Sequence, residues 1–171
     1  MLFRLIPAAV LAVALAVATP AAAQKIEVLG VFKDWTAYKT TQGGQPLCYM
    51  ASKPKKDEGK YKKRGDIYAM VAHRPAAKAN NVISIRAGYT YKAGGKPRLK
   101  IGGKTFTLFS NEDKAWATNA QADRAIVKAM KGGRTMIVTG VSSRGTKTRD
   151  TYSLLGFSAA HRAIGKACKV K

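Results

Sequence analysis

Residues able to carry catalytic chemistry are scarce in this 171-residue sequence. It contains no G-x-S-x-G nucleophile elbow, no H-E-x-x-H zinc motif, no C-x-x-C pair and no glycine-rich phosphate loop. Each of the two histidines, His73 and His161, is followed by an arginine and not by an acid or a cysteine, and we expect both at the surface. The sequence therefore predicts a protein that is not an enzyme and has neither a metal site nor a cofactor.

Long apolar segments are missing after the N-terminal region. Arg4 precedes an apolar run from Leu5 to Val17, which is followed by a proline and by three small residues that end at Ala23. This order is that of a secretory signal peptide, whereas the run is too short to span roughly 30 Å of hydrocarbon as a membrane anchor. We expect residues 1–23 to be removed near Ala23. Residues 24–171 would then form one domain without a transmembrane segment, in the periplasm, at the outer membrane or secreted.

Acidic residues are also few, nine against 31 lysines and arginines, which gives a formal net charge of +22. Arg4 is the only charged residue of the signal peptide, so the remaining 148 residues carry +21. A small domain needs a net charge of only about 2 to 8 for solubility. Because like charges repel one another and oppose the compact state, the excess indicates a polyanionic partner.

Only two cysteines are present, Cys48 and Cys168. An even number in an exported chain favours a disulfide, because the compartments outside the inner membrane are oxidising. This bridge would close a loop of 120 residues. The chain-entropy model gives about 4 to 5 kcal/mol of stabilisation for such a loop.

Short β-type segments separated by turn residues run through the processed chain, a pattern typical of an antiparallel sandwich or barrel. Residues 82–91, 98–101 and 105–109 are expected to form a three-stranded meander, because apolar and polar side chains alternate in them. Further strands are expected at 26–38, 67–72, 136–141 and 151–157. Six aromatic residues are assigned to the core: Phe32, Trp35, Tyr38, Phe106, Phe109 and Trp116.

Two short helices complete the predicted fold. Asn119 is a suitable N-cap for a helix that ends near Met130, before Gly132-Gly133. Ser158 is the expected N-cap of a C-terminal helix, whose apolar face would carry Cys168 toward the sheet. The predicted fold class is therefore mainly β, an antiparallel β-sandwich with one or two short helices.

Cationic residues crowd into one segment after residue 52: Lys53, Lys55, Lys56, Lys60, Lys62, Lys63 and Arg64. Contact with a phosphate, sulfate or carboxylate polymer would release counterions, so the segment is a candidate site for anionic polymers of the envelope or of a host surface. The alternative is a solvated loop without a ligand. Nucleic acid is a poor candidate, because export separates the protein from it and the segment lacks the aromatic platforms of single-strand binders. The same cations are compatible with peripheral contact with a membrane surface.

A second polar segment spans residues 140–154. It contains five side chains suited to an anionic or polar ligand: Ser142, Ser143, Arg144, Thr146 and Arg149. A twisted hairpin with Gly145 at its tip explains the same residues by strand chemistry alone. We favour the hairpin and keep the ligand surface as the alternative.

Several short motifs occur in an order that is hard to produce by chance. The most extensive are Gly30 to Trp35, Cys48 to Pro54, Gly88 to Tyr91, Ser142 to Thr146 and Asp150 to Leu154. Together they resemble the invasion-associated locus B family of Gram-negative envelope proteins, over nearly all of the processed chain. The resemblance implies an immunoglobulin-like β-sandwich, export to the periplasm or outer membrane and, through the founding member, a link to host-cell invasion. It implies no catalytic residues.

Three functions follow from these observations. The favoured one is a non-enzymatic exported envelope protein that binds anionic polymers or surfaces through a strongly basic face. The alternative is a host-cell interaction or invasion factor, which requires exposure on the cell surface. A hydrolase or an inhibitor comes third, because it requires a pocket with converging polar groups that the sequence does not reveal.

Overall fold

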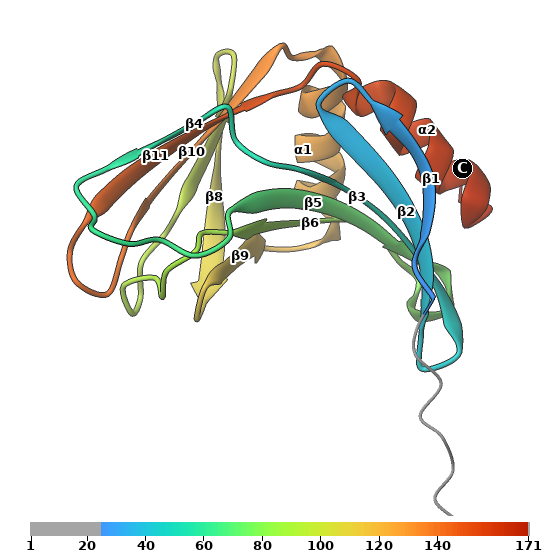
Figure 1. Cartoon of the computed structure of the whole chain (residues 1–171), viewed down its shortest axis with the longest axis horizontal. Coiled ribbons are helices and arrows are strands. Elements are labelled where there is room, and N and C mark those ends of the chain that lie inside the picture. The colour runs from blue at the N-terminus through green and yellow to red at the C-terminus, as the bar shows by residue number, and fades with distance from the viewer. Residues whose placement is uncertain (1–24, 171) are drawn as a thin grey trace, which may run out of the picture.

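Eleven strands and two α-helices make up residues 25–170, the part of the chain that the computed structural model describes (Figure 1). The predicted signal peptide, residues 1–23, lies outside the described residues. The strands are β1 (Glu27–Phe32), β2 (Trp35–Gln42), β3 (Gln45–Ser52), β4 (Lys56–Gly59), β5 (Tyr68–Arg74), β6 (Ala79–Arg86), β7 (Arg98–Ile101), β8 (Lys104–Asn111), β9 (Lys114–Ala117), β10 (Thr135–Val141) and β11 (Lys147–Ser153). The helices are α1 (Ala120–Gly132) and α2 (Phe157–Ala167), and a single 3-10 turn, η1 (Pro75–Ala77), follows β5.

The strands form one antiparallel sheet in the order β1-β2-β3-β5-β6-β9-β8-β7-β10-β11-β4. The sheet bends at β8, whose residues 104–107 pair with β7 and whose residues 108–111 pair with β9. The strands from β1 to β9 in this order form one half of the molecule, and those from β7 to β4 form the other (Figure 1). The predicted class, a mainly antiparallel β-sandwich with short helices, is confirmed.

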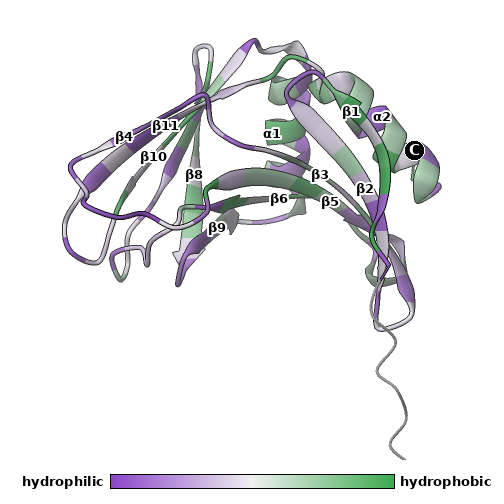
Figure 2. Ribbon diagram, viewed as in Figure 1, coloured by the Kyte–Doolittle hydropathy of each residue, from purple (hydrophilic) through white to green (hydrophobic). Residues whose placement is uncertain are grey.

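The core lies between the inner faces of the two halves and the helices. α2 packs on β1, β2 and β3, while α1 packs on β6. Trp35 is fully buried and meets Phe157 of α2 edge-on, with ring centroids 5.0 Å apart. Its indole Nε1 donates to the carbonyl oxygen of Ser153 at 3.0 Å, so that the one polar atom of the ring is satisfied. Figure 2 shows the hydrophobic stretches of both helices and the more polar character of β4.

The expected disulfide between Cys48 and Cys168 is confirmed. It joins the buried centre of β3 to the residue that follows α2, across 120 positions of the sequence. Cys48 is completely buried and Cys168 nearly so. The bridge therefore fixes the last helix on the first half of the sheet.

Three expectations about the elements require correction. The expected meander is right for its second and third strands, since β7 pairs with β8, and wrong for its first, because β6 pairs with β5 and with β9 (Lys114–Ala117), a strand that the sequence did not predict. Gly88, at φ +71°, turns the chain away after β6, and the following segment crosses to the other half, where β7 pairs with β10. The last strand ends at Ser153 and α2 begins at Phe157 after Gly156, so Ser158 is not the N-cap. Asn119 does cap α1, accepting from the Ala122 N–H at 2.9 Å.

The histidines, expected at the surface, meet between β5, which carries His73, and α2, which carries His161. His73 is fully buried, and its Nδ1 accepts from the Asn81 N–H at 3.1 Å. Nε2 of His161 lies 2.7 Å from Asn81 Oδ1, and the two rings meet edge-on with centroids 5.3 Å apart. Burial, assisted by the charge of Lys131, lowers the pKa of both imidazoles to about 4.

This burial predicts that acid weakens the fold. The unfolded chain takes up protons near pH 6.5, whereas the folded histidines remain neutral until about pH 4. Their contribution is therefore complete above pH 6.5 and is lost as the pH falls toward 4. Urea unfolding at several pH values should show this decline, and His161→Gln should make it shallower. An equal slope in both proteins would contradict the prediction.

Candidate anion-binding cleft

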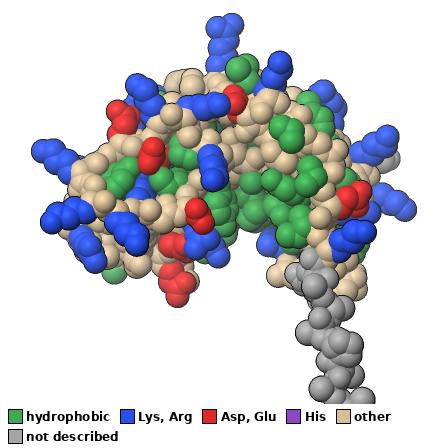
Figure 3. Space-filling model, in the orientation of Figure 1, with side chains coloured by type: hydrophobic (Ala, Val, Ile, Leu, Met, Phe, Trp, Pro, Cys, Tyr) green, Lys and Arg blue, Asp and Glu red, His purple; other side chains and the backbone are tan. Residues whose placement is uncertain are grey.

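The structure brings the two predicted binding segments together. Residues 60–65 of the lysine-rich segment and the β10–β11 turn line opposite sides of a cleft of about 630 Å³. A volume of this size is within the range of small-molecule sites. Figure 3 shows Lys and Arg side chains gathered at the end of the molecule where β4 and this turn lie. The two segments were separate candidates in the sequence, and they form one site.

Strand pairing explains why these segments meet. β4 is an edge strand that pairs with β11, with Gly59 opposite Thr148, so the chain leaving β4 runs beside the start of β11. The predicted hairpin is confirmed, because β10 and β11 pair over their full length and Gly145 lies at the tip with φ +83°. Ser142 holds the turn closed: its Oγ accepts from the Thr146 N–H at 3.1 Å. The Ser142 side chain is buried, and the turn uses one of the two acceptor positions of its hydroxyl.

Arg64 requires a correction, because the structure gives it an internal role. Its side chain is only 3% exposed, and Nη1 and Nη2 donate to the two carboxylate oxygens of Asp150, each at 2.6 Å. Nε donates to the carbonyl oxygen of Ala87 at 2.7 Å. These bonds use three of the five N–H donors of the guanidinium and pair its charge with a carboxylate. Arg64 is thus an anchor of the cleft and not a free cation.

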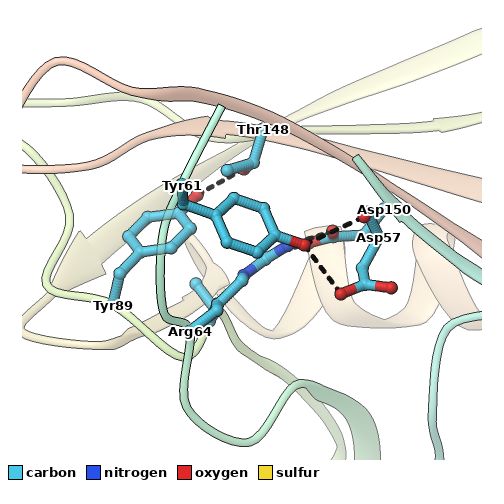
Figure 4. A network of polar contacts seen from close by, with 7 residues as sticks. Asp57, Tyr61, Arg64, Tyr89, Thr148 and Asp150 are labelled. Atoms are coloured by element: carbon cyan, nitrogen blue, oxygen red, sulfur yellow. Dashed lines mark hydrogen bonds and ion pairs between the residues drawn. The ribbon is translucent and has the colours of Figure 1, made fainter. Parts of the chain in front are cut away.

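Two tyrosines enclose this ion pair (Figure 4). The guanidinium of Arg64 lies 5.4 Å from the ring centroid of Tyr61 and 5.0 Å from that of Tyr89. Tyr61 donates its hydroxyl to Asp57 Oδ2 at 2.8 Å, and Tyr89 shares a 2.6 Å hydrogen bond with the Thr148 hydroxyl. The lysine-rich segment is thereby bound to both β4 and β11.

The electrostatics of the buried pair keep Arg64 charged. Burial disfavours its charged form, but the hydrogen bonds and the charge of Asp150 outweigh that effect and raise the pKa of the guanidinium. Burial raises the pKa of Asp150, and the guanidinium limits that rise. The buried pair therefore holds the two cationic segments together.

The cations free to meet a ligand in the cleft are Lys60, Lys62, Lys63 and Arg144. All four are exposed, and none has an ion-pair partner among residues 25–170. Among the described residues, no carboxylate lines the cleft. Ser143 and Thr146 add hydroxyl groups to its wall. The arrangement can hold a phosphate, sulfate or carboxylate group by charge and by hydrogen bonds.

The remaining residues of the two predicted sets lie elsewhere. Lys53 lines a groove on the other half of the molecule, Lys55 pairs with Asp34 at 2.5 Å, and Lys56 belongs to β4. Arg149 alternates with the buried Thr148 and Asp150, so its side chain leaves on the opposite face of β11, 3.9 Å from Glu58.

A second cationic area surrounds Arg149. Arg98 and Lys100 of β7 line a shallow depression with it on the outer face of β7, β10 and β11. The sequence analysis missed this area. Arg98 and Lys100 alternate with the buried Leu99 and Ile101, a pattern that places both cations on the exposed face of β7. Only the pairing of β7 with β10 shows that this face continues to Arg149.

The described residues offer little for catalysis in this region. Among residues 25–170 no three His, Cys, Asp or Glu side chains gather as a metal site would require. In the same range, no helix has the length and hydrophobicity that crossing a membrane requires.

Fold and site together define a small, disulfide-bonded antiparallel β protein with a cationic surface cleft. The family described as "Invasion associated locus B (IalB) protein" matches residues 35–165, and this chain belongs to that family. A similar solved structure is the "Crystal structure of invasion associated protein b from bartonella henselae", with a TM-score of 0.56 and 14% sequence identity over 82% of this chain and 96% of that chain. At this identity the similarity shows the fold alone. No curated protein matches the chain significantly.

Proposed function

We propose that this protein is a non-enzymatic exported envelope protein that binds anionic polymers, such as lipopolysaccharide or acidic polysaccharide, in the cleft between residues 60–65 and the β10–β11 turn. The supporting observation is a cleft that contains four free cations and no carboxylate. The net charge of the processed chain, +21, attracts a polyanion to this site over a distance. Family membership is compatible with an envelope role.

Binding would rest on several weak contacts. Each lysine or arginine that approaches an anionic group of the polymer displaces condensed counterions, and their release supplies the free energy. The buried Arg64–Asp150 pair keeps the cationic segment beside the turn, so less entropy is lost when a polymer binds. The cationic area at Arg98, Lys100 and Arg149 would extend the track for a long polymer.

The test is a variant with Lys60, Lys62, Lys63 and Arg144 replaced by glutamine. Affinity of the wild type for purified lipopolysaccharide and heparin should fall steeply, by on the order of a hundredfold or more, between 50 and 200 mM salt. The variant should bind more weakly, and the slope of log affinity against log salt should decrease by about 3, because four counterion-releasing contacts are lost. Titration calorimetry or biolayer interferometry would measure both.

A matched control removes the same charge elsewhere. Lys104, Lys114, Lys128 and Lys166 are exposed and do not line the cleft. Replacing these four by glutamine should change the salt slope much less. Equal effects of the two variants would show that net charge alone binds the polymer, and absence of salt-sensitive binding by the wild type would refute the proposal.

A role at a host-cell surface is the second candidate. The solved structure from Bartonella henselae is titled an invasion associated protein, and it shares this fold. Such a role requires the protein outside the outer membrane, whereas polymer binding in the envelope does not. Protease treatment of intact cells should leave a periplasmic protein, beginning at Gln24, undigested. Digestion without loss of a periplasmic marker would favour the host-surface role.

A further inference from the structure

The outer face of the first half of the sheet carries an apolar groove. It has a volume of about 740 Å³ and lies on β2, β3 and β5, on the side opposite the core helices. Figure 3 shows hydrophobic side chains gathered in a hollow at this place. A contiguous apolar surface of this kind on a solvent-facing sheet is uncommon and marks a binding site more often than chance exposure.

Tyr38, which the sequence assigned to the core, and its apolar neighbours form this surface. Tyr38 and Tyr49 are directly opposite residues of β2 and β3, and their rings stack with centroids 4.9 Å apart. Leu47, Ala51 and Met70 complete the floor of the groove. These residues alternate with fully buried ones, such as Cys48 and Met50, so the strands are apolar on both faces although only one face is covered.

The charges around the groove are cationic. Lys53 lies at the end of β3 beside Tyr68, and Arg74 lies at the opposite end, near Leu47. Asp34, the only acid of the lining, is neutralised by Lys55 at 2.5 Å. Arg74 donates to Gln42 Oε1 at 3.2 Å, whereas Lys53 is exposed and has no ion-pair partner among residues 25–170. Arg74 also lacks an ion-pair partner in that range, but it is half-buried and its guanidinium is held by Gln42, so Lys53 is the more accessible of the two cations.

We propose that this groove binds the acyl chain of a single anionic amphiphile, with the chain on Leu47, Ala51 and Met70 and the anionic headgroup at Lys53. The hydrophobic floor supplies the apolar contact, and the lysine selects a negative headgroup. The site is separate from the polymer-binding cleft, so neither proposal depends on the other.

The observations disfavour three other occupants. A second copy of the chain would bring a second molecule of net charge +21 against the first and, in a symmetric dimer, Lys53 and Arg74 against their own copies. A flat bilayer cannot reach the floor of a hollow, whereas one chain can enter it. A sugar ring needs hydrogen-bonding partners as well as an aromatic face, whereas Leu47, Ala51 and Met70 make the floor apolar and the stack takes up one face of Tyr38 and of Tyr49.

The methionines offer a direct readout. Met70 lines the groove, whereas Met50, Met130 and Met136 are completely buried in the core. In protein labelled with 13C at the methionine methyl groups, dodecanoate below its micelle concentration should shift the Met70 signal and leave the other three in place. Dodecyl maltoside, which has the same chain and a neutral headgroup, should bind at least fivefold more weakly.

Variants test the site itself. Ala51→Trp fills the groove and Leu47→Gln makes its floor polar, so each should weaken dodecanoate binding at least tenfold. Lys53→Glu should weaken dodecanoate binding and spare dodecyl maltoside. Leu155 is an exposed apolar residue outside the groove, so the Leu155→Ser variant should bind dodecanoate as the wild type does. The variant with the four cleft cations replaced should also bind dodecanoate as the wild type does.

Several results would overturn the proposal. These are an unmoved Met70 signal, equal shifts of all four methionines, equal binding of the two amphiphiles, or a Met70 shift that depends on protein concentration without ligand and so reports a dimer. In each variant, methyl signals of the three core methionines at their wild-type chemical shifts establish that the fold is intact.

Discussion

Replacing Asp150 by asparagine is expected to lower the free energy of unfolding by about 3 to 5 kcal/mol, because the change leaves the Arg64 charge buried without its partner. Both side chains are only 3% exposed, and two 2.6 Å hydrogen bonds join them. Asp57 lies opposite Asp150 on β4, but it accepts from Tyr61 and has no hydrogen bond to Arg64. Chemical unfolding of the purified variant would measure the loss.

A double substitution distinguishes the lost pair from lost packing. Arg64→Met with Asp150→Leu removes both charges and fills similar volume, so it should recover much of the stability that Asp150→Asn loses. Glu58→Gln is the matched surface control, because Glu58 and Arg149 are each more than half exposed and 3.9 Å apart. It should cost less than about 1 kcal/mol. A loss of that small size for Asp150→Asn would contradict the assignment of Arg64 as an anchor.

Removing the disulfide should have an effect of similar size. Cys48→Ala with Cys168→Ala frees a loop of 120 residues in the unfolded chain, and the expected loss of stability is about 2 to 5 kcal/mol. The fold should survive, since a chain of this length buries a substantial core without the bridge. Thermal unfolding, followed by circular dichroism, would show a lower midpoint with an unchanged native spectrum.

Two observations would contradict this expectation. Labelling of two thiols per chain in denatured, non-reduced wild-type protein would show that the bridge does not form in solution. An unfolded double variant would show that the core depends on it more than the chain-entropy argument allows. Reduction of the wild type with dithiothreitol serves as the control, because it breaks the same bond without changing the packing of either side chain.

Local chemistry determined the parts of the fold that the sequence predicted. Asn119 caps α1 because its short side chain reaches the Ala122 N–H, a relation visible within four positions. Gly145 forms the hairpin tip because the turn requires a positive φ. The disulfide followed from parity and compartment. The helix cap and the turn follow from residues close together in the sequence, and the disulfide follows from the number of cysteines. None of the three requires knowledge of which distant segments lie side by side.

Distant pairing determined the parts that the sequence did not predict. Arg64 resembles its lysine neighbours in sequence, and only Asp150, 86 positions away, makes it a buried anchor. Arg149 belongs to the polar hairpin, but strand alternation turns it away from the cleft. Tyr38, Phe109 and Trp116 were assigned to the core by hydrophobicity. They lie on the outer face, because hydrophobicity alone does not say which face of a strand is covered.

The late position of α2 in the chain determines when the molecule can close. Trp35 of β2 can make its contacts with Phe157 and with the carbonyl oxygen of Ser153 only after these later residues are present. The same holds for Cys48, whose partner is Cys168. The N-terminal signal expected from the sequence would direct the chain through a narrow translocation channel. The first strands would emerge from that channel well before these partners. Contacts of such long sequence separation form slowly. The chain would therefore remain unfolded enough to pass through the channel until α2 has crossed. The Cys48–Cys168 disulfide would form only in the oxidising compartment beyond the membrane.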